Sequence, residues 1–469
     1  MSNTLEQMTL ENIAKACGGT YVGEDALRSK EITGAAIDSR QVEPGYLYIP
    51  IRGERVDGHR FIPDVFAKGA LAVLSEEPLE DATGPYIQVV SSEQALKDIA
   101  EFYRSTLSIK IIGITGSVGK TSTKEMISAV LGQKYNVLKT EGNFNNEIGL
   151  PLTILRIRRE HEVAVVEMGI SEFGEMHRIA KVAKPDICVM TNIGQCHLEN
   201  LIDRDGVLRA KSEIFDFLKP DGHIVLNGND DKLITVKEIN GVKPVFYYVE
   251  DGTAKKADLP YEITADAIEN KGLRGLNANL HFPEEVCRIH EPIPGVHNVY
   301  NACAAACVGR IMELTNEEIC EGIAHAKTIA GRTNLITLGE VLVIDDCYNA
   351  NPVSMKASLD VLAQAEGRKI AVLGDMGELG ENECELHYEV GKYAANAGVD
   401  ILFCCGPLSE ELAKGAQRGH TKVMYFAERE KLTQTLLNFV EAGDTVLVKA
   451  SHFMEFPKIV KALEEALED

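Results

Sequence analysis

Tryptophan is missing from the sequence, and aromatic residues make up only 6% of its 469 residues. Proteins that hold single-stranded nucleic acid stack its bases on aromatic side chains, so this shortage argues against that class. Positive charge is scarce as well, with 48 Lys and Arg against 71 Asp and Glu and a net charge of −23. An acidic chain is poorly suited to binding polyanions, so we expect no nucleic-acid partner. A phosphate-bearing ligand must be small and held by local groups.

Long apolar runs are also lacking. None reaches the ~18 residues of a membrane-spanning helix, so we expect no insertion into a membrane. The first residues, "MSNTLEQMTLENIAKACGG", predict an amphipathic helix ending at Gly18-Gly19 rather than a signal peptide. The 11 cysteines are scattered through apolar segments. Cys303…Cys307 and Cys404-Cys405 lack zinc spacing, so we predict free thiols in a reducing cytoplasm.

The length of the chain predicts several domains, because one core rarely serves more than about 250–300 residues. Residues 1–107 mix short strands with helices. Residues 108–329 open with the apolar strand "IKIIGIT" and alternate strands with helices, and residues 330–469 repeat the alternation. Near-continuous apolar runs that end in polar or Gly-rich turns indicate a parallel sheet covered on both faces. We therefore predict an α/β protein of three domains.

The stretch "KIIGITGSVGKTSTKEM" looks like a phosphate-binding loop with one glycine displaced. The usual motif G-x-x-x-x-G-K-[ST] would place its first glycine at Ile114. A strand before the loop and a helix after it still predict anion binding at the helix N-terminus. Lys120 would reach the terminal phosphates and Thr121 would reach Mg²⁺, while Gly116 and Gly119 let the backbone approach the anion. The alternative is a tight turn with a Ser or Thr that caps the helix.

Two further residues follow strands of the same predicted sheet. Glu167 ends the apolar run "VAVVE", where an unpaired carboxylate would be costly to bury. A metal ion or a salt bridge to a nearby Lys or Arg would explain it. His197 lies in the loop "NIGQCHLE" and could be an ordinary surface histidine. Its predicted position at the sheet edge that carries Glu167 and the phosphate loop favours a metal ligand.

Lys211, in "LRAKSEIF", is open to two interpretations. It could be an exposed helical lysine paired with Glu213. Alternatively, its free amine could react with CO₂ to give a carbamate, an anionic metal ligand that a nearby divalent ion would stabilise. Nothing local in the sequence decides between the two.

Polar residues between positions 298 and 346 suggest further nucleotide contacts. Asn298 and Asn301 open a helix of small residues, where an amide could meet a purine or ribose edge and Asn298 could simply cap the helix. Arg332, at the second domain junction, could swing onto a phosphate. Asp345 and Asp346 follow a strand, and one of them could hold a ribose hydroxyl.

Taken in order, these motifs resemble the Mur ligases, the ATP-dependent amide ligases that assemble the peptidoglycan stem peptide. The segments that carry the resemblance are "TGSVGKTST", "EMG", "NIGQCHLE", "AKSEIF", "PGVHNVYNA", "GRTN", "DDCYNANPVSM" and "LGDMGELG". The family's phosphate loop is a compact G-x-x-G-K-[ST], which accounts for the displaced glycine. The stretches "YNANP" and "LGDMGELG" favour the member that adds D-alanyl-D-alanine to UDP-N-acetylmuramoyl-tripeptide. The absence of a D-N-P-R motif argues against the member that adds the third residue.

The resemblance implies a fold and a role for each matching residue. The domains would be a small α/β UDP-binding domain (1–107), a central parallel-sheet P-loop ATPase domain (108–329) and a C-terminal Rossmann-like domain (330–469). The catalytic residues would be Lys120, Glu167, His197 and Lys211. Mg²⁺ would be held by Thr121, Glu167, His197 and Lys211, the last N6-carbamylated. ATP would contact Gly116, Ser117, Gly119, Lys120, Thr121, Ser122, Asn298, Asn301, Arg332 and Asp346. The substrates would contact Ser39, Arg40, Asn143, Asn145, Asn146, Tyr348, Asn349 and Ser451.

One stretch departs from the family pattern. Where the family often has G-S-R, this chain has Ala450, Ser451 and His452. The role of an arginine is therefore not carried over to this loop.

The resemblance also implies the reaction. ATP would phosphorylate the terminal carboxylate of the tripeptide, and the amine of D-alanyl-D-alanine would then attack the acyl phosphate. We expect a cytoplasmic monomer whose third domain closes over the site through the segment "AKTIAGRTN". The alternatives are another amino-acid ligase of the same superfamily, or an ATP-binding P-loop switch that makes no amide.

Overall fold

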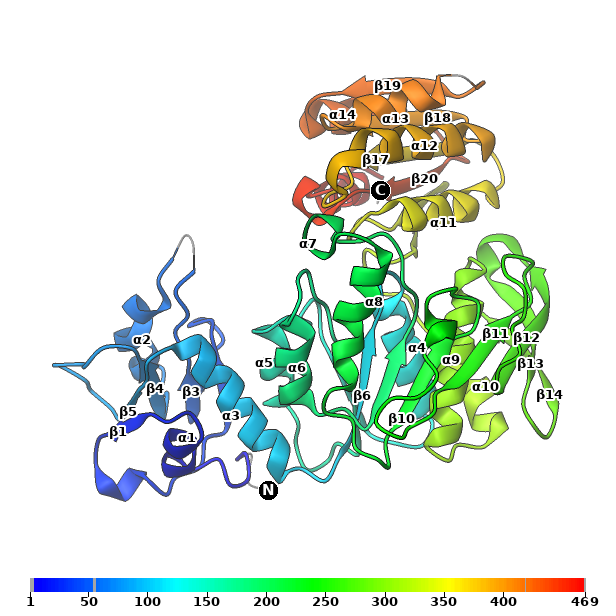
Figure 1. The fold of residues 1–469 in the computed structure, drawn as a ribbon. Coiled ribbons are helices and arrows are strands. Elements are labelled where there is room, and N and C mark those ends of the chain that lie inside the picture. Colours follow the sequence, from blue (N-terminus) through cyan, green and yellow to red (C-terminus); the bar gives the residue numbers. More distant parts are fainter. Residues whose placement is uncertain (1–3, 54–55, 418, 468–469) are drawn as a thin grey trace.

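The computed structural model describes residues 4–53, 56–417 and 419–467. The strands form three separate sheets of five, nine and six strands. In Figure 1 the N-terminal sheet lies beside the nine-stranded sheet, and the C-terminal sheet lies above it. The boundary inferred after residue 107 falls between α3 (Ser92–Thr106) and β6 (Lys110–Thr115). The boundary inferred after residue 329 falls between α10 (Asn316–Ala324) and β15 (Asn334–Leu338).

The N-terminal domain is a small sheet in the order β1-β5-β4-β3-β2, parallel except for the β1–β5 pair. Its remaining elements are β1 (Thr20–Val22), β2 (Gly34–Ala36), β3 (Tyr46–Tyr48), β4 (Ala72–Ser75), β5 (Tyr86–Gln88), α1 (Leu10–Ala16), α2 (Ile62–Ala67) and the 3₁₀ turns η1 (Asp25–Leu27) and η2 (Gly58–Phe61). The first helix is shorter than the sequence predicts. It begins after Thr9, whose side chain accepts a hydrogen bond from the Asn12 amide, and Gln7 has a φ of 62° that no α-helix tolerates. The predicted residues 1–3 lie outside the described part.

The middle domain contains the nine-stranded sheet, in the order β14-β13-β12-β11-β10-β9-β6-β8-β7. Along the sheet from β7 through β6 to β12, neighbouring strands run parallel, as predicted. The antiparallel pairs β12–β13 and β13–β14 extend the sheet and were not predicted. The other strands are β7 (Val137–Lys139), β8 (Val163–Glu167), β9 (Ile187–Met190), β10 (His223–Asn227), β11 (Val245–Val249), β12 (Tyr261–Asn270), β13 (Leu276–His281) and β14 (Val286–Glu291).

Helices cover both faces of this sheet, and neighbouring strand residues divide between two cores. Ile111 packs into the core formed with α3, α5, α6 and α8, whereas Ile112 packs into the core formed with α4, α9 and α10. The helices are α4 (Lys120–Leu131), α5 (Gly149–Ile154), α6 (Glu175–Ala183), α7 (Leu198–Leu201), α8 (Arg204–Ser212) and α9 (His297–Ile311), with 3₁₀ turns η3 (Glu213–Phe215), η4 (Leu233–Thr235) and η5 (Gly272–Arg274). Burial on both faces explains the near-continuous apolar strands of the sequence.

The C-terminal domain is a sheet in the order β15-β16-β20-β17-β18-β19, parallel except for β15. Its elements are β16 (Val341–Asp345), β17 (Lys369–Gly374), β18 (Ile401–Cys405), β19 (Lys422–Phe426), β20 (Thr445–Lys449), α11 (Pro352–Ala363), α12 (Glu383–Asn396), α13 (Ser409–Ala416), α14 (Arg429–Leu437), α15 (Pro457–Leu467) and the 3₁₀ turns η6 (Gly380–Asn382) and η7 (His452–Met454). Helices α11, α12 and α13 pack on one face, and α14 and α15 pack on the other. In Figure 1 the domain stands above β6 and α8 of the middle domain.

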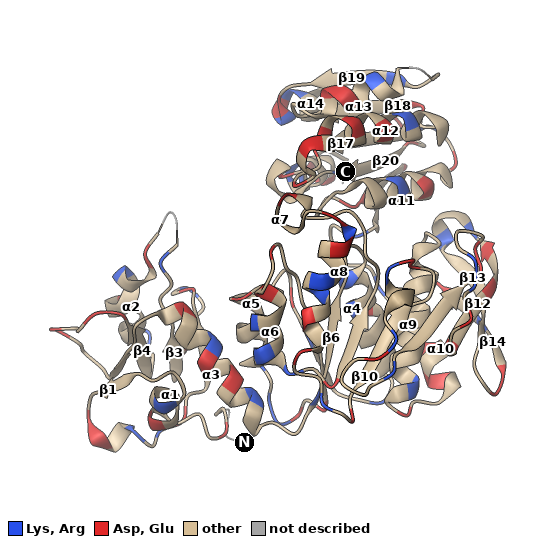
Figure 2. Cartoon of the chain, in the orientation of Figure 1, with Lys and Arg blue, Asp and Glu red and all other residues tan. Residues whose placement is uncertain are grey.

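Acidic and basic segments are interspersed over all three domains (Figure 2). All 11 cysteines are free thiols, and most are buried. Among the described helices, none combines the length and the apolar character that crossing a bilayer requires.

Candidate active site

The phosphate loop joins the end of β6 to the start of α4, at the centre of the middle sheet. Gly116 has a φ of 150°, and a Cβ there would lie 1.9 Å from Thr191 Oγ1. Gly119 has a φ of 83° and is the N-cap of α4, which has no side-chain cap. Both glycines are therefore required by the backbone, and the interpretation of this turn as a Ser- or Thr-capped helix start is wrong. The first amides of α4 are left to face an anion.

The residues after β9 brace this loop. Val118 N donates to Asn192 Oδ1 over 3.0 Å, and Ser117 N donates to the Asn192 carbonyl over 3.0 Å. Thr191 Oγ1 donates to the Val118 carbonyl over 2.6 Å. The segment "MTNIG" therefore fixes the loop from the neighbouring strand, a role that sequence reasoning missed. The signal was present, since Thr and Asn follow a buried strand at the same sheet edge.

Glu167 lies at the end of β8 and is almost fully buried. Its carboxylate accepts 2.9 Å hydrogen bonds from Thr121 Oγ1 and from Asn145 Nδ2. Among the described residues no Lys, Arg or His forms an ion pair with it, so the salt-bridge interpretation is wrong. A buried carboxylate held only by neutral donors is suited to a cation that is not part of the chain.

Lys211 is also buried, with 1% of its surface exposed, so the interpretation of it as an exposed helical lysine is wrong. Glu213 does not pair with it, because that carboxylate accepts from the amides of Gly174 and His177. Among the described residues, the Lys211 amine has no hydrogen-bond or ion-pair partner. Burial and the positive charge of Lys120 lower the pKa of Lys211 to about 8. The amine is therefore easier to deprotonate than that of a solvated lysine.

His197 precedes α7 and has a left-handed backbone, with a φ of 51°. Its Nδ1 lies 2.5 Å from Glu378 Oε2, and this imidazole lowers the pKa of Glu378. Within the described residues no group of three or more His, Cys, Asp or Glu forms a metal site. A cluster made of these four residue types alone therefore does not account for a cation here.

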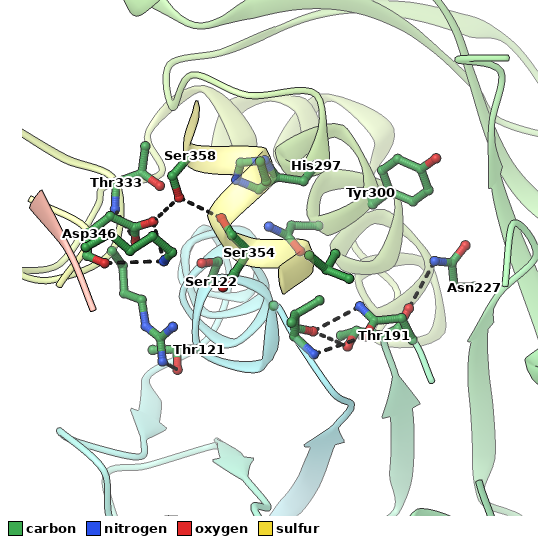
Figure 3. Close-up of a pocket in the computed structure, with 18 of the residues that line it drawn as sticks. Thr121, Ser122, Thr191, Asn227, His297, Tyr300, Thr333, Asp346, Ser354 and Ser358 are labelled. Atoms are coloured by element: carbon green, nitrogen blue, oxygen red, sulfur yellow. Dashed lines mark hydrogen bonds and ion pairs between the residues drawn. The ribbon is translucent and has the colours of Figure 1, made fainter. Parts of the chain in front are cut away.

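A cavity of about 250 Å³ opens beside the phosphate loop, between the middle and C-terminal domains (Figure 3). From the middle domain it is lined by Val118, Gly119, Thr121, Ser122, Thr191, Asn192, Asn227, Tyr247, His297, Tyr300 and Asn301. From the hinge and the C-terminal domain it is lined by Arg332, Thr333, Asp346, Val353, Ser354, Ala357, Ser358 and Lys449. Tyr247, Asn227 and Lys449 were not predicted, because they lie in strands that carry no motif marking a nucleotide site. Tyr300 was also missed, although it lies in the segment "PGVHNVYNA" between the two predicted asparagines.

The two predicted asparagines take different places. Asn301 lines the cavity, and its Oδ1 accepts from Thr123 Oγ1 over 2.7 Å. Asn298 lies behind it, where its Oδ1 accepts from Asn301 Nδ2 over 2.9 Å. Helix α9 has Val296 as its N-cap, so the interpretation of Asn298 as a capping residue is wrong.

The two aspartates after β16 also differ. Asp346 lines the cavity and accepts from Lys449 Nζ over 2.7 Å and from the Thr333 amide over 3.1 Å. Asp345 is turned to the hinge, where its Oδ2 accepts from the Gly331 amide over 2.6 Å. Of the two, Asp346 is the one that a ligand in the cavity can meet.

Arg332 reaches from the hinge to the phosphate loop. Its Nη2 lies 3.4 Å from Thr121 Oγ1, and its guanidinium stacks 4.2 Å from the centre of the Tyr348 ring. Its Nε is buried and has no hydrogen-bond partner among the described residues. A donor left free beside the loop is available to a phosphate.

Comparison of the sequence with known proteins identifies its family. The sequence matches the Mur ligase family catalytic domain over residues 31–104, the Mur ligase middle domain over 114–309 and the Mur ligase glutamate ligase domain over 331–452. It is 37% identical to the UDP-N-acetylmuramoyl-tripeptide--D-alanyl-D-alanine ligase of Bacillus subtilis, over 98% of each chain. The chain belongs to the Mur ligase family.

Two solved structures of Mur ligases share this fold. A MurF crystal structure from Acinetobacter baumannii has a TM-score of 0.87 and 32% identity, over 97% of this chain and 98% of that one. MurF from Thermotoga maritima, in complex with ADP, has a TM-score of 0.79 and 28% identity, over 93% of this chain and 98% of that one. The predicted family and three-domain α/β fold are confirmed.

The remaining predicted residues of this Mur ligase are distributed over all three domains. Ser39 and Arg40 lie in the N-terminal domain between β2 and β3, where Arg40 forms an ion pair with Asp38 and the Ser39 carbonyl accepts from Lys68. Asn143 is exposed in the loop before α5, and Asn146 Oδ1 accepts from the Gly149 amide over 2.8 Å. Asn146 therefore has a structural role at the start of that helix.

In the C-terminal domain, the Asn349 carbonyl accepts from Lys449 over 3.1 Å. Ser451 Oγ accepts from the Gly377 amide over 2.9 Å. His452, which stands where the family often has arginine, has its ring centre 5.7 Å from that of Tyr348. The loop after β20 thus lies against the same tyrosine that Arg332 covers.

Proposed function

We propose that this Mur ligase uses ATP to join D-alanyl-D-alanine to UDP-N-acetylmuramoyl-tripeptide through an acyl phosphate, releasing ADP and phosphate. The support is its membership of the family and its likeness over nearly the full length to a relative named for this reaction. The observation that carries the chemistry is the contact between the phosphate loop and the buried Glu167, through Thr121. A site for phosphoryl transfer and a site for a cation thereby meet at one sheet edge.

The reaction requires that a carboxylate be activated, because its negative charge repels the incoming amine. Phosphorylation reduces this repulsion. A carboxylate oxygen attacks the γ-phosphorus of ATP, and the bond from that phosphorus to the bridging oxygen of ADP breaks. The dipeptide amine then attacks the acyl carbon, and the C–O bond to phosphate breaks as the amine loses a proton. The amides of α4 and the Lys120 ammonium stabilise the negative charge on the transferring group.

Magnesium suits the pair formed by Thr121 and Glu167. Glu167 lacks a cation partner among the described residues, and the Thr121 hydroxyl already touches it. We infer that Thr121, Glu167, His197 and Lys211 would hold Mg²⁺, which offsets the charge that builds between two anions. The buried, unpartnered Lys211 amine would add CO₂ and lose a proton, giving a carbamate that can serve as an anionic ligand.

The C-terminal domain would complete the nucleotide site. Arg332 and Asp346 would contact phosphate and ribose, and Asn301, supported by Asn298, would meet the adenosine side of ATP. The other proposed nucleotide contacts come from the loop itself, namely Gly116, Ser117, Gly119, Lys120, Thr121 and Ser122. Closing this domain over the cavity would exclude water from the acyl phosphate, which hydrolyses readily.

The substrates would lie between the domains. Ser39 and Arg40 would contact the UDP group, and Asn143, Asn145 and Asn146 would contact the muramoyl-peptide near the γ-phosphate. Tyr348, Asn349 and Ser451 would contact the incoming dipeptide. We also propose a cytoplasmic monomer.

A coupled phosphate-release assay across amine donors tests the proposal. With ATP, Mg²⁺ and UDP-N-acetylmuramoyl-tripeptide, D-alanyl-D-alanine should give phosphate and an equal amount of pentapeptide nucleotide. Single amino acids tested with shorter muramoyl precursors, or glutamate with a folate, should give neither. ATP hydrolysis without any amide product would favour the P-loop switch, and product with another donor would favour another ligase of the family.

A further inference from the structure

Apart from hydrogen bonds within the hinge segment 326–334, such as that from Thr328 Oγ1 to Asn334 Oδ1, two polar contacts between described residues join residues 330–469 to the middle domain, and both end on proposed magnesium ligands. One is the 3.4 Å contact from Arg332 Nη2 to Thr121 Oγ1. The other is the 2.5 Å approach of Glu378 Oε2 to His197 Nδ1. Within the described parts of the chain, the His197–Glu378 pair is the only ion pair between residues 108–329 and residues 330–469. The proposed metal site is thus where the two domains meet.

Glu378 is presented by a loop that is fixed on both sides of it. The loop follows β17, and its Met376 amide donates to the buried His387 ring at Nε2 over 2.9 Å. The next amide, that of Gly377, donates to Ser451 Oγ over 2.9 Å. The side chains of Met376 and Leu379 are buried in the core of the C-terminal domain. The position of Glu378 is therefore set by the whole domain.

Both members of the pair have an unusual backbone. The φ of Glu378 is 60° and that of His197 is 51°. Residues other than glycine seldom adopt this left-handed conformation, which costs roughly 1–2 kcal/mol per residue. Two such residues facing each other across a domain boundary indicate that the contact is specified by the surrounding structure.

The contact affects which nitrogen of the His197 ring carries a proton and which one has a lone pair available. His197 Nδ1 is buried, and Glu378 Oε2 lies 2.5 Å from it, although the two do not meet the geometry of a hydrogen bond. A carboxylate at this distance still favours the proton on Nδ1. It thereby leaves Nε2 as the nitrogen with a lone pair, the arrangement in which a carboxylate orients a metal-binding histidine.

An ordinary ion pair would explain little here. The Glu378 side chain is 60% exposed, and exposed pairs stabilise a fold by at most ~1 kcal/mol. The contact therefore contributes little to folding. Its effect is instead on which nitrogen of the His197 ring carries the proton.

We propose that Glu378 is a positioning residue, carried by the C-terminal domain to His197, so that domain closure completes the magnesium site. The proposal rests on the proposed function, because it takes His197 as a metal ligand. Linkage makes the effect reciprocal: if closure strengthens metal binding, the metal must favour closure to the same extent. The hinge residue Arg332 touches a second ligand, Thr121, in the same arrangement.

The test compares Glu378→Ala and Glu378→Gln with the full-length enzyme. The control is Glu381→Gln, a carboxylate three residues further along the same loop, without a partner among the described residues. Mn²⁺ serves as the spectroscopic probe, and its affinity in the presence of ADP is measured by electron paramagnetic resonance. Small-angle scattering reports compaction on adding Mn²⁺ and ADP, and it needs no labelling of the free cysteines.

We expect Glu378→Ala to weaken Mn²⁺ binding by about 10-fold or more, the usual cost of losing such a partner, and to reduce compaction. Glu378→Gln keeps an oxygen that can accept from Nδ1, so it should lose less, and Glu381→Gln should match the wild type. Wild-type Mn²⁺ affinity and compaction in Glu378→Ala would overturn the proposal. Neither readout needs product formation, so a wild type that binds Mn²⁺ and ADP but makes no amide would overturn the proposed function alone. An unfolded Glu378→Ala would also contradict the proposal, because the contact would then be one that the fold depends on.

Discussion

The Thr121 hydroxyl donates a 2.9 Å hydrogen bond to Glu167, so the first turn of α4 is joined directly to the end of β8. Both residues are placed by secondary structure, and both are buried. Lys120, one position earlier, makes a different kind of contact. Its Nζ donates to the Gly116 carbonyl over 2.9 Å, within the loop itself. The loop is therefore built from its backbone, and its lysine is available for a ligand.

Lys120→Ala should abolish turnover and leave the fold intact. Losing a charge that stabilises the transferring phosphoryl group should lower kcat by ~10²-fold or more. The midpoint of thermal unfolding should stay within a few degrees of the wild type, because one intraloop hydrogen bond is lost. Lys134→Ala, an exposed lysine just after the same helix, is the control and should keep its activity. Gross unfolding of Lys120→Ala would contradict a backbone-built loop.

Lys211→Ala should lose activity that short carboxylic acids such as formate or acetate partly restore. The added acid would supply the carboxylate that the carbamate provides in the wild type. Lys219→Ala removes an exposed lysine from the segment after α8 and should behave as the wild type. The measurement is initial rate against acid concentration. A high-resolution map with an unmodified Lys211 amine and no metal nearby would contradict the carbamate.

The apolar strands explain why much of the fold could be predicted. Runs such as "IKIIGIT" and "VAVVE" are buried on both faces, and a sequence shows this directly. The strands β12 to β14 were not predicted. The alternation of β12 is interrupted near a register shift between Asp266 and Glu269, and β14 is largely exposed, whereas β13 alternates regularly and its signal was missed. Strand β15 is short and half-exposed, so it carries little apolar signal.

The site was predictable where its residues follow strands or a motif. Glu167 and the phosphate loop belong to this class. Lys211 could not be decided, because its burial depends on how α8 packs and leaves no trace in the neighbouring residues. The Glu378 contact with His197 was equally inaccessible, since it joins residues far apart in the chain.

Glu291 should make stability depend on pH. Burial raises its pKa from 4.5 to about 8, and its Oε2 is buried without a hydrogen-bond partner among the described residues. The folded protein therefore keeps a proton that the unfolded chain releases above about pH 4.5. The protonated carboxyl stabilises the fold fully below that pH, and the stabilisation is lost as pH rises through about 8.

Glu291→Gln should remove this dependence, because its amide stays neutral. The free energy of unfolding of the variant should increase relative to that of the wild type as pH rises from 5 to 8.5, by at most ~3–5 kcal/mol. Exposed Glu250→Gln is the control and should follow the wild type. Parallel curves for Glu291→Gln and the wild type would show that the buried carboxyl is not protonated.

Ligands should compact the molecule through the hinge. Arg332 links the hinge to Thr121, and Gly331 has a φ of 79° that favours glycine. Scattering should show a smaller radius of gyration with a non-hydrolysable ATP analogue, Mg²⁺ and UDP-N-acetylmuramoyl-tripeptide than without them. Arg332→Ala should compact less, with Arg332→Lys between it and the wild type. Identical profiles for free and ligand-saturated protein would count against closure.

The most direct measurement follows an oxygen atom. UDP-N-acetylmuramoyl-tripeptide labelled with ¹⁸O in its reacting carboxylate is incubated with ATP, Mg²⁺, D-alanyl-D-alanine and enzyme, and the phosphate is analysed by mass spectrometry. If the carboxylate attacks the γ-phosphorus, each phosphate released with a new amide bond carries one ¹⁸O. Phosphate without the label, formed alongside pentapeptide or without it, would contradict activation of the carboxylate by ATP.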